Sequence, residues 1–155
     1  MNFLKILIDG DNCNNIKTIE RIAKEFNIGC HIYANYCRNV ESDYSEIHIV
    51  DCTRDAADFA IINNCNVGDI IITNDSGLAA MVLSKNGIPI KTNGMEFTKS
   101  NIMRYLNSRY MTEKEKRRTN RDQIRRQKMT PDKFTTHPKF CVTLLKIISR
   151  CQELS

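Results

Sequence analysis

Short apolar runs alternate with helical segments along residues 1–110, and this alternation constrains the fold more than any other feature. Strands are predicted at Phe3–Ile8, Cys30–Ala34, Glu46–Val50, Ile70–Thr73 and Ile88–Lys91. Apolar side chains at helical spacing predict helices at Ile16–Phe26, Arg54–Asn63, Leu78–Leu83 and Ser100–Tyr110. Strands and helices that alternate through short connections predict an α/β fold, a three-layer α/β/α domain with a mostly parallel central sheet.

The chain changes character after residue 110. Residues 111–130 carry eight basic and three acidic side chains but few apolar ones, which predicts a basic, exposed helical segment. Beyond Pro131 and Pro138, apolar residues from Phe140 to Ile148 recur at helical spacing. The sequence therefore predicts an α/β domain at 1–110, a basic segment at 111–130, and a region at 131–155 whose amphipathic helix packs on the domain.

Composition narrows the classes of protein that the chain can belong to. Hydrophobic residues make up 41% and charged residues 26%, as in globular proteins. The apolar runs are too short to span a membrane and no signal peptide is visible, so we expect a cytoplasmic protein without a membrane partner. The seven cysteines include no C-x-x-C pair and are expected to be reduced thiols. His31, His48 and His137 are scattered, and no zinc site is predicted.

Five aspartates occupy positions where strands end or helices begin. Asp9 and Asp11 follow the first strand, Asp75 follows the Ile70 strand, and Asp55 and Asp58 begin the helix between them. Ligands of open α/β sheets bind beyond the carboxyl ends of the strands, where the strand order reverses. If the first strand and the Ile70 strand are neighbours, these carboxylates converge. Carboxylates stay ionised together around a cation, and oxygen ligands favour Mg²⁺ or Mn²⁺, which promote displacement at phosphorus.

Each aspartate also has a simpler explanation. Aspartate is a common turn residue and helix cap, and capping explains Asp75 as well as metal binding does. Asp55 and Asp58 are favoured near a helix start by the helix dipole alone. Their joint placement at two strand ends nevertheless favours a common site.

Three segments, IDGDNCNN, RDAADFAI and GDIIITNDSGLAAMVLSKNG, resemble the YaiI/YqxD family, also called UPF0178 or DUF188, of the PIN-like superfamily of nucleases. The resemblance covers about residues 1–110 and implies a PIN-like α/β/α fold. It implies a catalytic acidic group of Asp9, Asp11, Asp55, Asp58 and Asp75, lined by Asn12, Thr73, Asn74 and Ser76. Cys13 matches the family's cysteine, whereas two family prolines are replaced by Asn14 and Gly77.

The leading hypothesis is a Mg²⁺- or Mn²⁺-dependent nuclease acting on RNA. The metal ligands would be Asp9, Asp11, Asp55 and Asp75, with Asp58 acting through water. Phosphate-binding residues of the basic segment would be Arg117, Arg118, Arg121, Arg125, Arg126 and Lys128, unless that segment is only a solvated, charged helix.

Two alternatives stay open. One is a nucleic-acid-binding module with an inactive acidic site. The other is a phosphatase of the haloacid dehalogenase type, since Asp9-Gly10-Asp11 fits its D-x-D motif, although Cys13 and the lack of a late acidic pair argue against it. The sequence leaves the oligomeric state open, a homodimer included.

Overall fold

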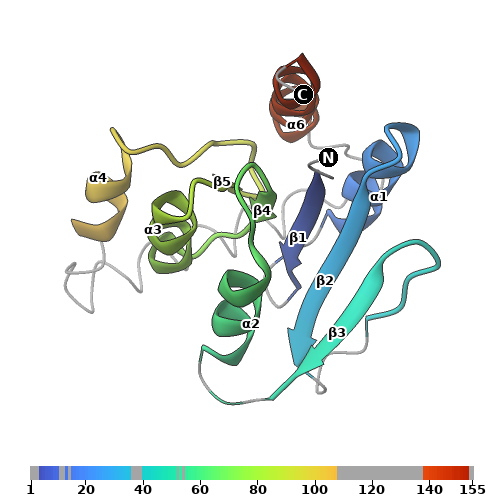
Figure 1. Cartoon of the computed structure of the whole chain (residues 1–155), viewed down its shortest axis with the longest axis horizontal. Coiled ribbons are helices and arrows are strands. Elements are labelled where there is room, and N and C mark those ends of the chain that lie inside the picture. Colours follow the sequence, from blue (N-terminus) through green and yellow to red (C-terminus); the bar gives the residue numbers. More distant parts are fainter. Residues whose placement is uncertain are drawn as a thin grey trace, which may run out of the picture.

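Five parallel strands form one sheet in the order β3-β2-β1-β4-β5 (Figure 1). The computed structural model describes residues 4–10, 13, 15–35, 40–51, 53, 55–107 and 138–153. The strands are β1 (Lys5–Asp9), β2 (Gly29–Asn35), β3 (Glu46–Val50), β4 (Ile70–Ile72) and β5 (Ile88–Ile90). The predicted α/β fold is confirmed, and every pair of neighbouring strands in the sheet is parallel.

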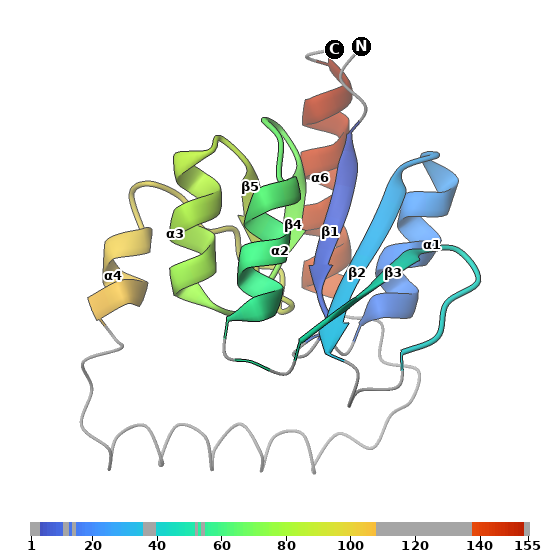
Figure 2. The ribbon, with the colours of Figure 1, turned by 60° about the horizontal axis from the view of Figure 1, so that its bottom comes forward.

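Helices cover both faces of the sheet (Figure 2). The covering helices are α1 (Ile16–Glu25), α2 (Ala56–Asn64), α3 (Ser76–Ser84) and α6 (Pro138–Glu153), and α4 (Ile102–Asn107) packs against α3. One apolar cluster joins α1 and α6 to the sheet through residues such as Ile8, Ile19 and Phe140. The opposite cluster joins α2 and α3 to the sheet through Leu7 and Ile71 among others. None of the helices in the described residues has the length and apolar composition needed to cross a membrane.

The alternation of side chains in β1 explains this three-layer arrangement. Ile6 and Ile8 point into the cluster under α1 and α6, whereas Leu7 points into the cluster under α2 and α3. A strand buried on both faces must be apolar at successive positions, as Ile6–Ile8 and Ile70–Ile72 are. The most apolar runs of the sequence therefore form the two central strands.

The strand order reverses between β1 and β4. From β1 the chain passes outward through β2 to β3, and then returns to form β4 and β5 on the other side of β1. Ile8 is in register with Ile72, so Asp9 and Thr73 stand at equivalent positions at the carboxyl ends of neighbouring strands. This is the position where open α/β sheets bind ligands.

The end of β1 differs in one detail from the prediction, and the start of α1 has an asparagine that does not cap the helix. Asp9 is the last residue of β1 and does not follow the strand. Asn15 occupies the N-cap position of α1, yet its side chain makes no capping bond. Its Nδ2 donates to the Thr92 carbonyl at 3.2 Å, and its Oδ1 accepts a bond from Cys13 Sγ at 3.0 Å. Asn15 thus ties the start of α1 to the loop after β5, because a buried amide needs partners on both of its polar atoms.

Candidate active site

A buried hydrogen-bond chain joins the ends of β1 and β4. Asp9 and Thr73 are only 4% and 1% exposed. Thr73 Oγ1 donates to Asp9 Oδ2 at 3.1 Å, and the backbone N–H of Asp75 donates to Thr73 Oγ1 at 3.1 Å. Asp9 is therefore held in a fixed position by the neighbouring strand, as a group that must present one carboxylate oxygen to a ligand would be.

Gly10 lets the chain turn away after Asp9. Its N–H donates to the Tyr33 carbonyl at 2.8 Å. A Cβ at this position would lie 2.9 Å from Ile32 Cγ2 and 3.0 Å from the Tyr33 carbonyl oxygen. Only glycine allows the backbone to approach β2 so closely. The glycine in the IDGD stretch is thus explained by packing.

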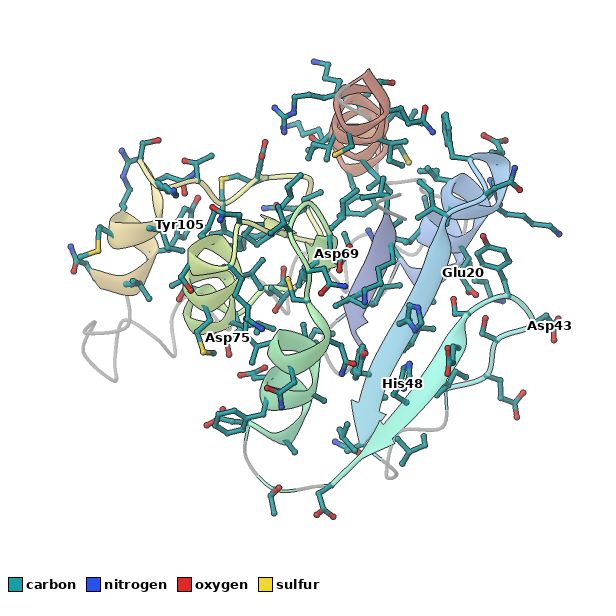
Figure 3. All side chains as sticks on the ribbon, viewed as in Figure 1. Glu20, Asp43, His48, Asp69, Asp75 and Tyr105 are labelled. Carbon is teal, nitrogen blue, oxygen red and sulfur yellow. The ribbon has the colours of Figure 1, made fainter. Side chains whose placement is uncertain are left out.

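Asp75 caps α3. Its Oδ1 accepts bonds from the backbone N–H groups of Gly77 at 2.8 Å and Leu78 at 3.4 Å. Helix capping, the simpler explanation for this aspartate, is therefore confirmed. The residue also lies at the amino-terminal end of α3 on the side of α2 (Figure 3), which brings it to the helix that carries Asp58.

Asp55 occupies the N-cap position of α2 without capping it. Its φ of 68° is left-handed, a conformation uncommon for residues other than glycine, and its side chain makes no capping bond. Thr53, two residues before Asp55, contributes only its carbonyl, which accepts from the N–H of Ala56 at 3.2 Å. Capping therefore does not explain the carboxylate at position 55.

The pKa of Asp58 is affected by the other carboxylates at this end of the sheet. Its pKa is raised from 3.8 to about 7, first by burial and then by the negative charges of Asp75, Asp9 and Asp55. A hydrogen bond with Asp75 favours the protonated form further. Every charged group that shifts this pKa is another carboxylate. We call Asp9, Asp55, Asp58 and Asp75 the acidic cluster.

The acidic cluster borders a pocket of about 310 Å³ between α2 and α3. Asp55, Asp58 and Asp75 line it together with Phe59, Gly77, Leu78 and Met81. Carboxylates that repel one another in this way are stabilised by a cation, and oxygen ligands suit Mg²⁺ or Mn²⁺. Carboxylate oxygens suit such an ion in their chemistry, although no three carboxylates of the acidic cluster, all of which lie in the described residues, offer ligand atoms within 4.8 Å of one another.

The remaining predicted site residues in the described part of the chain are not among those that line this pocket. Asn74 Oδ1 accepts from the N–H and the hydroxyl of Thr92, at 3.2 and 3.1 Å, and so holds the loop after β5. Ser76 is the first residue of α3. The other predicted residues, Asp11, Asn12, Arg117, Arg118, Arg121, Arg125, Arg126 and Lys128, lie outside the described residues.

Two apolar residues beside the acidic cluster were not predicted from the sequence. Phe59 is 60% exposed and Met81 is 37% exposed, and both line the pocket. Large apolar side chains in a sequence are ordinarily assigned to the core, so neither residue was expected at a site. A signal was present, because Phe59 follows Asp55 by four residues and so lies on the same face of α2.

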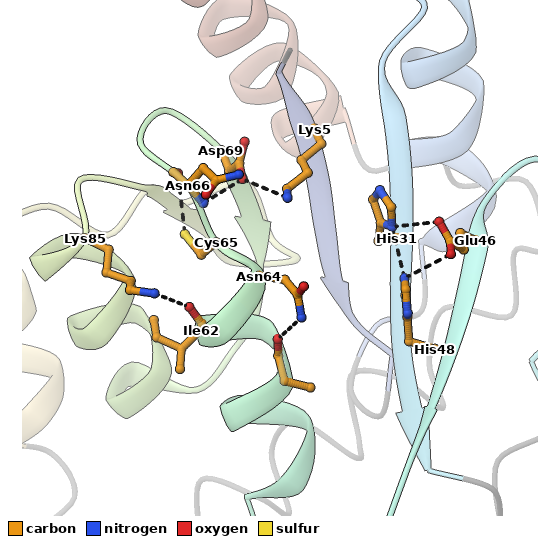
Figure 4. Close-up of polar contacts among 11 residues, drawn as sticks. Lys5, His31, Glu46, His48, Ile62, Asn64, Cys65, Asn66, Asp69 and Lys85 are labelled. Carbon is orange, nitrogen blue, oxygen red and sulfur yellow. Dashed lines mark hydrogen bonds and ion pairs between the residues drawn. The ribbon is translucent and has the colours of Figure 1, made fainter. Parts of the chain in front are cut away.

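The expectation that the histidines are scattered is wrong for two of them. His31 on β2 and His48 on β3 meet, with Nδ1 of His31 lying 3.0 Å from Nε2 of His48 (Figure 4). Glu46 approaches the same two nitrogens at 3.4 and 4.0 Å. These three side chains, called here the histidine cluster, offer ligand atoms within 4.8 Å of one another and could hold a metal ion.

The pairing of β2 with β3 creates the histidine cluster. In the parallel register, His31 lies beside Glu46, and Tyr33 lies beside His48. The sequence showed the alternation of His31 with Tyr33 and of Glu46 with His48, which places each pair on one face of its strand. It did not show which residues of the two strands would be neighbours.

Comparison with known proteins identifies the family of this chain. The family DUF188, described as an uncharacterised YaiI/YqxD family, matches residues 7–150. A UPF0178 protein of Alkaliphilus oremlandii is 42% identical over 115 residues, which cover 74% of this chain and 74% of that protein. A UPF0178 protein of Clostridium acetobutylicum is 34% identical over 122 residues, covering 79% and 82%. No solved structure matches this chain. The chain belongs to the YaiI/YqxD family, also called DUF188 or UPF0178.

Proposed function

We propose that this chain is a Mg²⁺- or Mn²⁺-dependent nuclease that hydrolyses RNA phosphodiester bonds at the acidic cluster. The observation that carries the proposal is the gathering of four carboxylates at the point where the strand order reverses. The resemblance of the segments IDGDNCNN, RDAADFAI and GDIIITNDSGLAAMVLSKNG to a family of PIN-like nucleases also supports a nuclease function. A structural role would not call for this arrangement, because mutual repulsion of the carboxylates opposes folding.

The residues of the acidic cluster, together with Asp11, would have different roles in binding the metal. Asp9 would ligate the metal from the carboxyl end of β1, oriented by the bond from Thr73 Oγ1. Asp75 would ligate it too, although its Oδ1 already accepts two backbone N–H groups. Asp55 and Asp11 would complete the coordination, and Asp58 would act through a water. A bound divalent ion activates water and stabilises the leaving oxygen of an in-line displacement.

The pocket also supports a nucleic acid as the substrate. Phe59 is exposed beside Asp58, and an aromatic face can stack on an unpaired base. Met81 adds an apolar surface on the α3 side of the same pocket. The amino-terminal ends of α2 and α3 carry partial positive charge, which attracts a phosphate group. A single-stranded segment could thus be held by its base and its phosphate at once.

The direct test is cleavage of end-labelled single-stranded RNA in Mn²⁺ or Mg²⁺. We expect cleavage by the wild type and a fall of about 100-fold or more in Asp9→Asn, equivalent to about 2.7 kcal/mol of transition-state stabilisation. Asp43→Asn is the matched control, because it removes an exposed carboxylate that is not among the charges acting on Asp58. It should cleave as the wild type does.

Two results would contradict the proposal. Equal inactivity of the wild type and Asp9→Asn across a broad set of RNA substrates would remove the catalytic role. Rapid turnover of p-nitrophenyl phosphate, with Asp9→Asn inactive and RNA left intact, would favour the phosphatase alternative instead. A matching circular dichroism spectrum for each variant excludes loss of folding as the cause.

A further inference from the structure

The histidine cluster differs chemically from the acidic cluster. It combines two imidazole nitrogens with one carboxylate, whereas the acidic cluster offers only oxygen ligands. Imidazole suits Zn²⁺ and its neighbours among the transition metals, whereas carboxylate oxygens suit Mg²⁺ and Mn²⁺. Two His and one Glu form an established ligand set for Zn²⁺ sites that keep one coordination position open.

The spacing of the ligand atoms fits one ion. Ligands about 2.0–2.1 Å from a tetrahedral Zn²⁺ lie about 3.3 Å from each other. The three distances here are 3.0 Å between the histidine nitrogens, 3.4 Å from His31 Nδ1 to Glu46, and 4.0 Å from His48 Nε2 to Glu46. Small side-chain rotations would equalise them. Figure 4 shows all three groups turned toward the same point between β2 and β3.

The neighbouring strands orient the ligand side chains before a metal ion binds. The His48 ring stacks on Tyr33, with ring centroids 4.6 Å apart and an interplanar angle of 10°. Tyr33 is itself buried in the core under α2, so this stacking fixes the plane of the imidazole. Ligands fixed before binding lose little conformational freedom when the ion arrives.

Solvent can reach the cluster. The side chains of His31, His48 and Glu46 are 25%, 33% and 67% exposed, so a water can complete the coordination. Among the described residues, Lys5 is the cation whose charge acts on His31, and its ammonium group pairs with Asp69 at 3.7 Å. This ion pair reduces the repulsion that Lys5 would exert on a bound metal.

The two clusters share a face of the sheet but are separate. Asp9 is in register with Tyr33, and Tyr33 is in register with His48. His48 is therefore two strands away from Asp9, roughly 10 Å at ordinary strand spacing, with the buried Tyr33 ring between them.

We propose that His31, Glu46 and His48 bind one Zn²⁺ ion, with a water as the fourth ligand, and that the ion fastens the edge strand β3 to β2. Among the described strands, β3 pairs with β2 alone and stands at the end of the sheet. An edge strand held from one side gains most from a bond across to its neighbour.

The test is zinc titration of the full chain, freed of metal by chelation, followed by imidazole nitrogen NMR and calorimetry. One equivalent of Zn²⁺ should shift the ring signals of His31 and His48. His31→Gln and His48→Gln should each lower zinc affinity at least about tenfold. Asp43→Asn is the control, because it removes an exposed carboxylate that is not part of the histidine cluster. Zinc should raise the melting temperature of the wild type but not of His48→Gln.

Two results would overturn the zinc site. Unchanged His31 and His48 ring signals at one equivalent of Zn²⁺ would exclude these ligands without relying on any variant. Zinc binding that survives in His31→Gln and His48→Gln but is lost in Asp9→Asn would assign the ion to the acidic cluster. Either outcome leaves the proposed nuclease untouched, because that depends on Mn²⁺ or Mg²⁺ at the aspartates.

Discussion

Asp58 carries a carboxyl group whose titration the fold displaces to about pH 7. An unfolded chain releases this proton near pH 3.8, so between these values the folded state binds the extra proton. Stability contributed by this group is therefore fully present below about pH 4 and is lost as the pH rises through 7.

This displacement predicts an effect of Asp58→Asn on stability. From pH 5 to pH 8, the metal-free wild type should lose about 1–2 kcal/mol relative to Asp58→Asn, allowing for partial solvent screening. Urea denaturation at the two pH values measures the difference. Asp43→Asn, which removes an exposed carboxylate, should follow the wild type. A constant difference between wild type and Asp58→Asn at both pH values would contradict the displaced pKa.

At Asp75, helix capping and charge can be separated by two substitutions. Asparagine also caps helices well, so Asp75→Asn should retain the stability of the wild type while its Mn²⁺ affinity falls. Asp75→Ala loses the bonds to Gly77 and Leu78 and should be less stable by about 1 kcal/mol as well. Thermal unfolding and calorimetry with Mn²⁺ measure the two quantities. Unchanged Mn²⁺ affinity in Asp75→Asn would leave capping as the sole role.

The aspartates and the histidines show what a sequence can reveal about a site. Asp9, Asp58 and Asp75 could be predicted as a group, because each ends a strand or begins a helix and the α/β topology brings such positions together. His31 and His48 could not, because their meeting depends on the register between β2 and β3. A shift of one residue in that register would place them on opposite faces.

Among the elements of the fold, the turn after β1 depends on Gly10. Gly10→Ala would force a methyl group to within 2.9 Å of Ile32 Cγ2 and 3.0 Å of the Tyr33 carbonyl oxygen. We expect a loss of about 1–3 kcal/mol in the free energy of unfolding, because β1 and β2 must move apart. Gly29→Ala is the control, since its methyl group would meet only His31 Nε2 at 3.9 Å. Equal stability of both variants in urea would contradict the close approach.

The sequence predicted the presence of the strands and helices more accurately than the residues at which they begin and end. Apolar runs predicted all five strands, since the inner strands of the sheet are buried on both faces and must be apolar at successive positions. The start of α1 was less predictable, because Asn15 bonds to Thr92 and Cys13 in preference to its own helix. Such tertiary hydrogen bonds compete with local capping and leave no periodic signal.

For the molecule as a whole, α6 closes the face of the sheet opposite the acidic cluster. Phe140, Leu144, Ile147 and Ile148 are buried there with the residues of α1. The helix is also bound at its edge, where Thr143 Oγ1 donates to the Gly94 carbonyl at 2.7 Å. The last helix of the chain is therefore part of the core.

Truncation of a buried α6 residue should reduce stability accordingly. Phe140→Ala should lower the free energy of unfolding by about 3–5 kcal/mol, because the ring is fully buried. Val142, on the same helix, is 50% exposed, so Val142→Ala should change it by less than about 0.5 kcal/mol. Guanidinium denaturation compares the two. Similar small losses in both would mean that α6 is only loosely docked.

The basic residues between α4 and α6 offer a test of nucleic-acid binding that is independent of catalysis. Four of them, Arg117, Arg118, Arg125 and Arg126, can be replaced together by glutamine. If each contacts a phosphate of single-stranded RNA, the slope of log affinity against log salt should fall by about 3, since each contact contributes about 0.7.

Fluorescence anisotropy in EDTA, at salt concentrations of about 50 to 200 mM, measures this slope without cleavage. Asp9→Asn is the control and should bind RNA as the wild type does, because its lost charge opposes phosphate binding. If RNA binding depends on the arginines while no metal supports cleavage, the chain is a nucleic-acid-binding module with an inactive acidic site. If the arginine variant keeps the wild-type slope, residues 111–130 form a charged surface without a role in RNA binding, and substrate contacts must come from the pocket at Phe59.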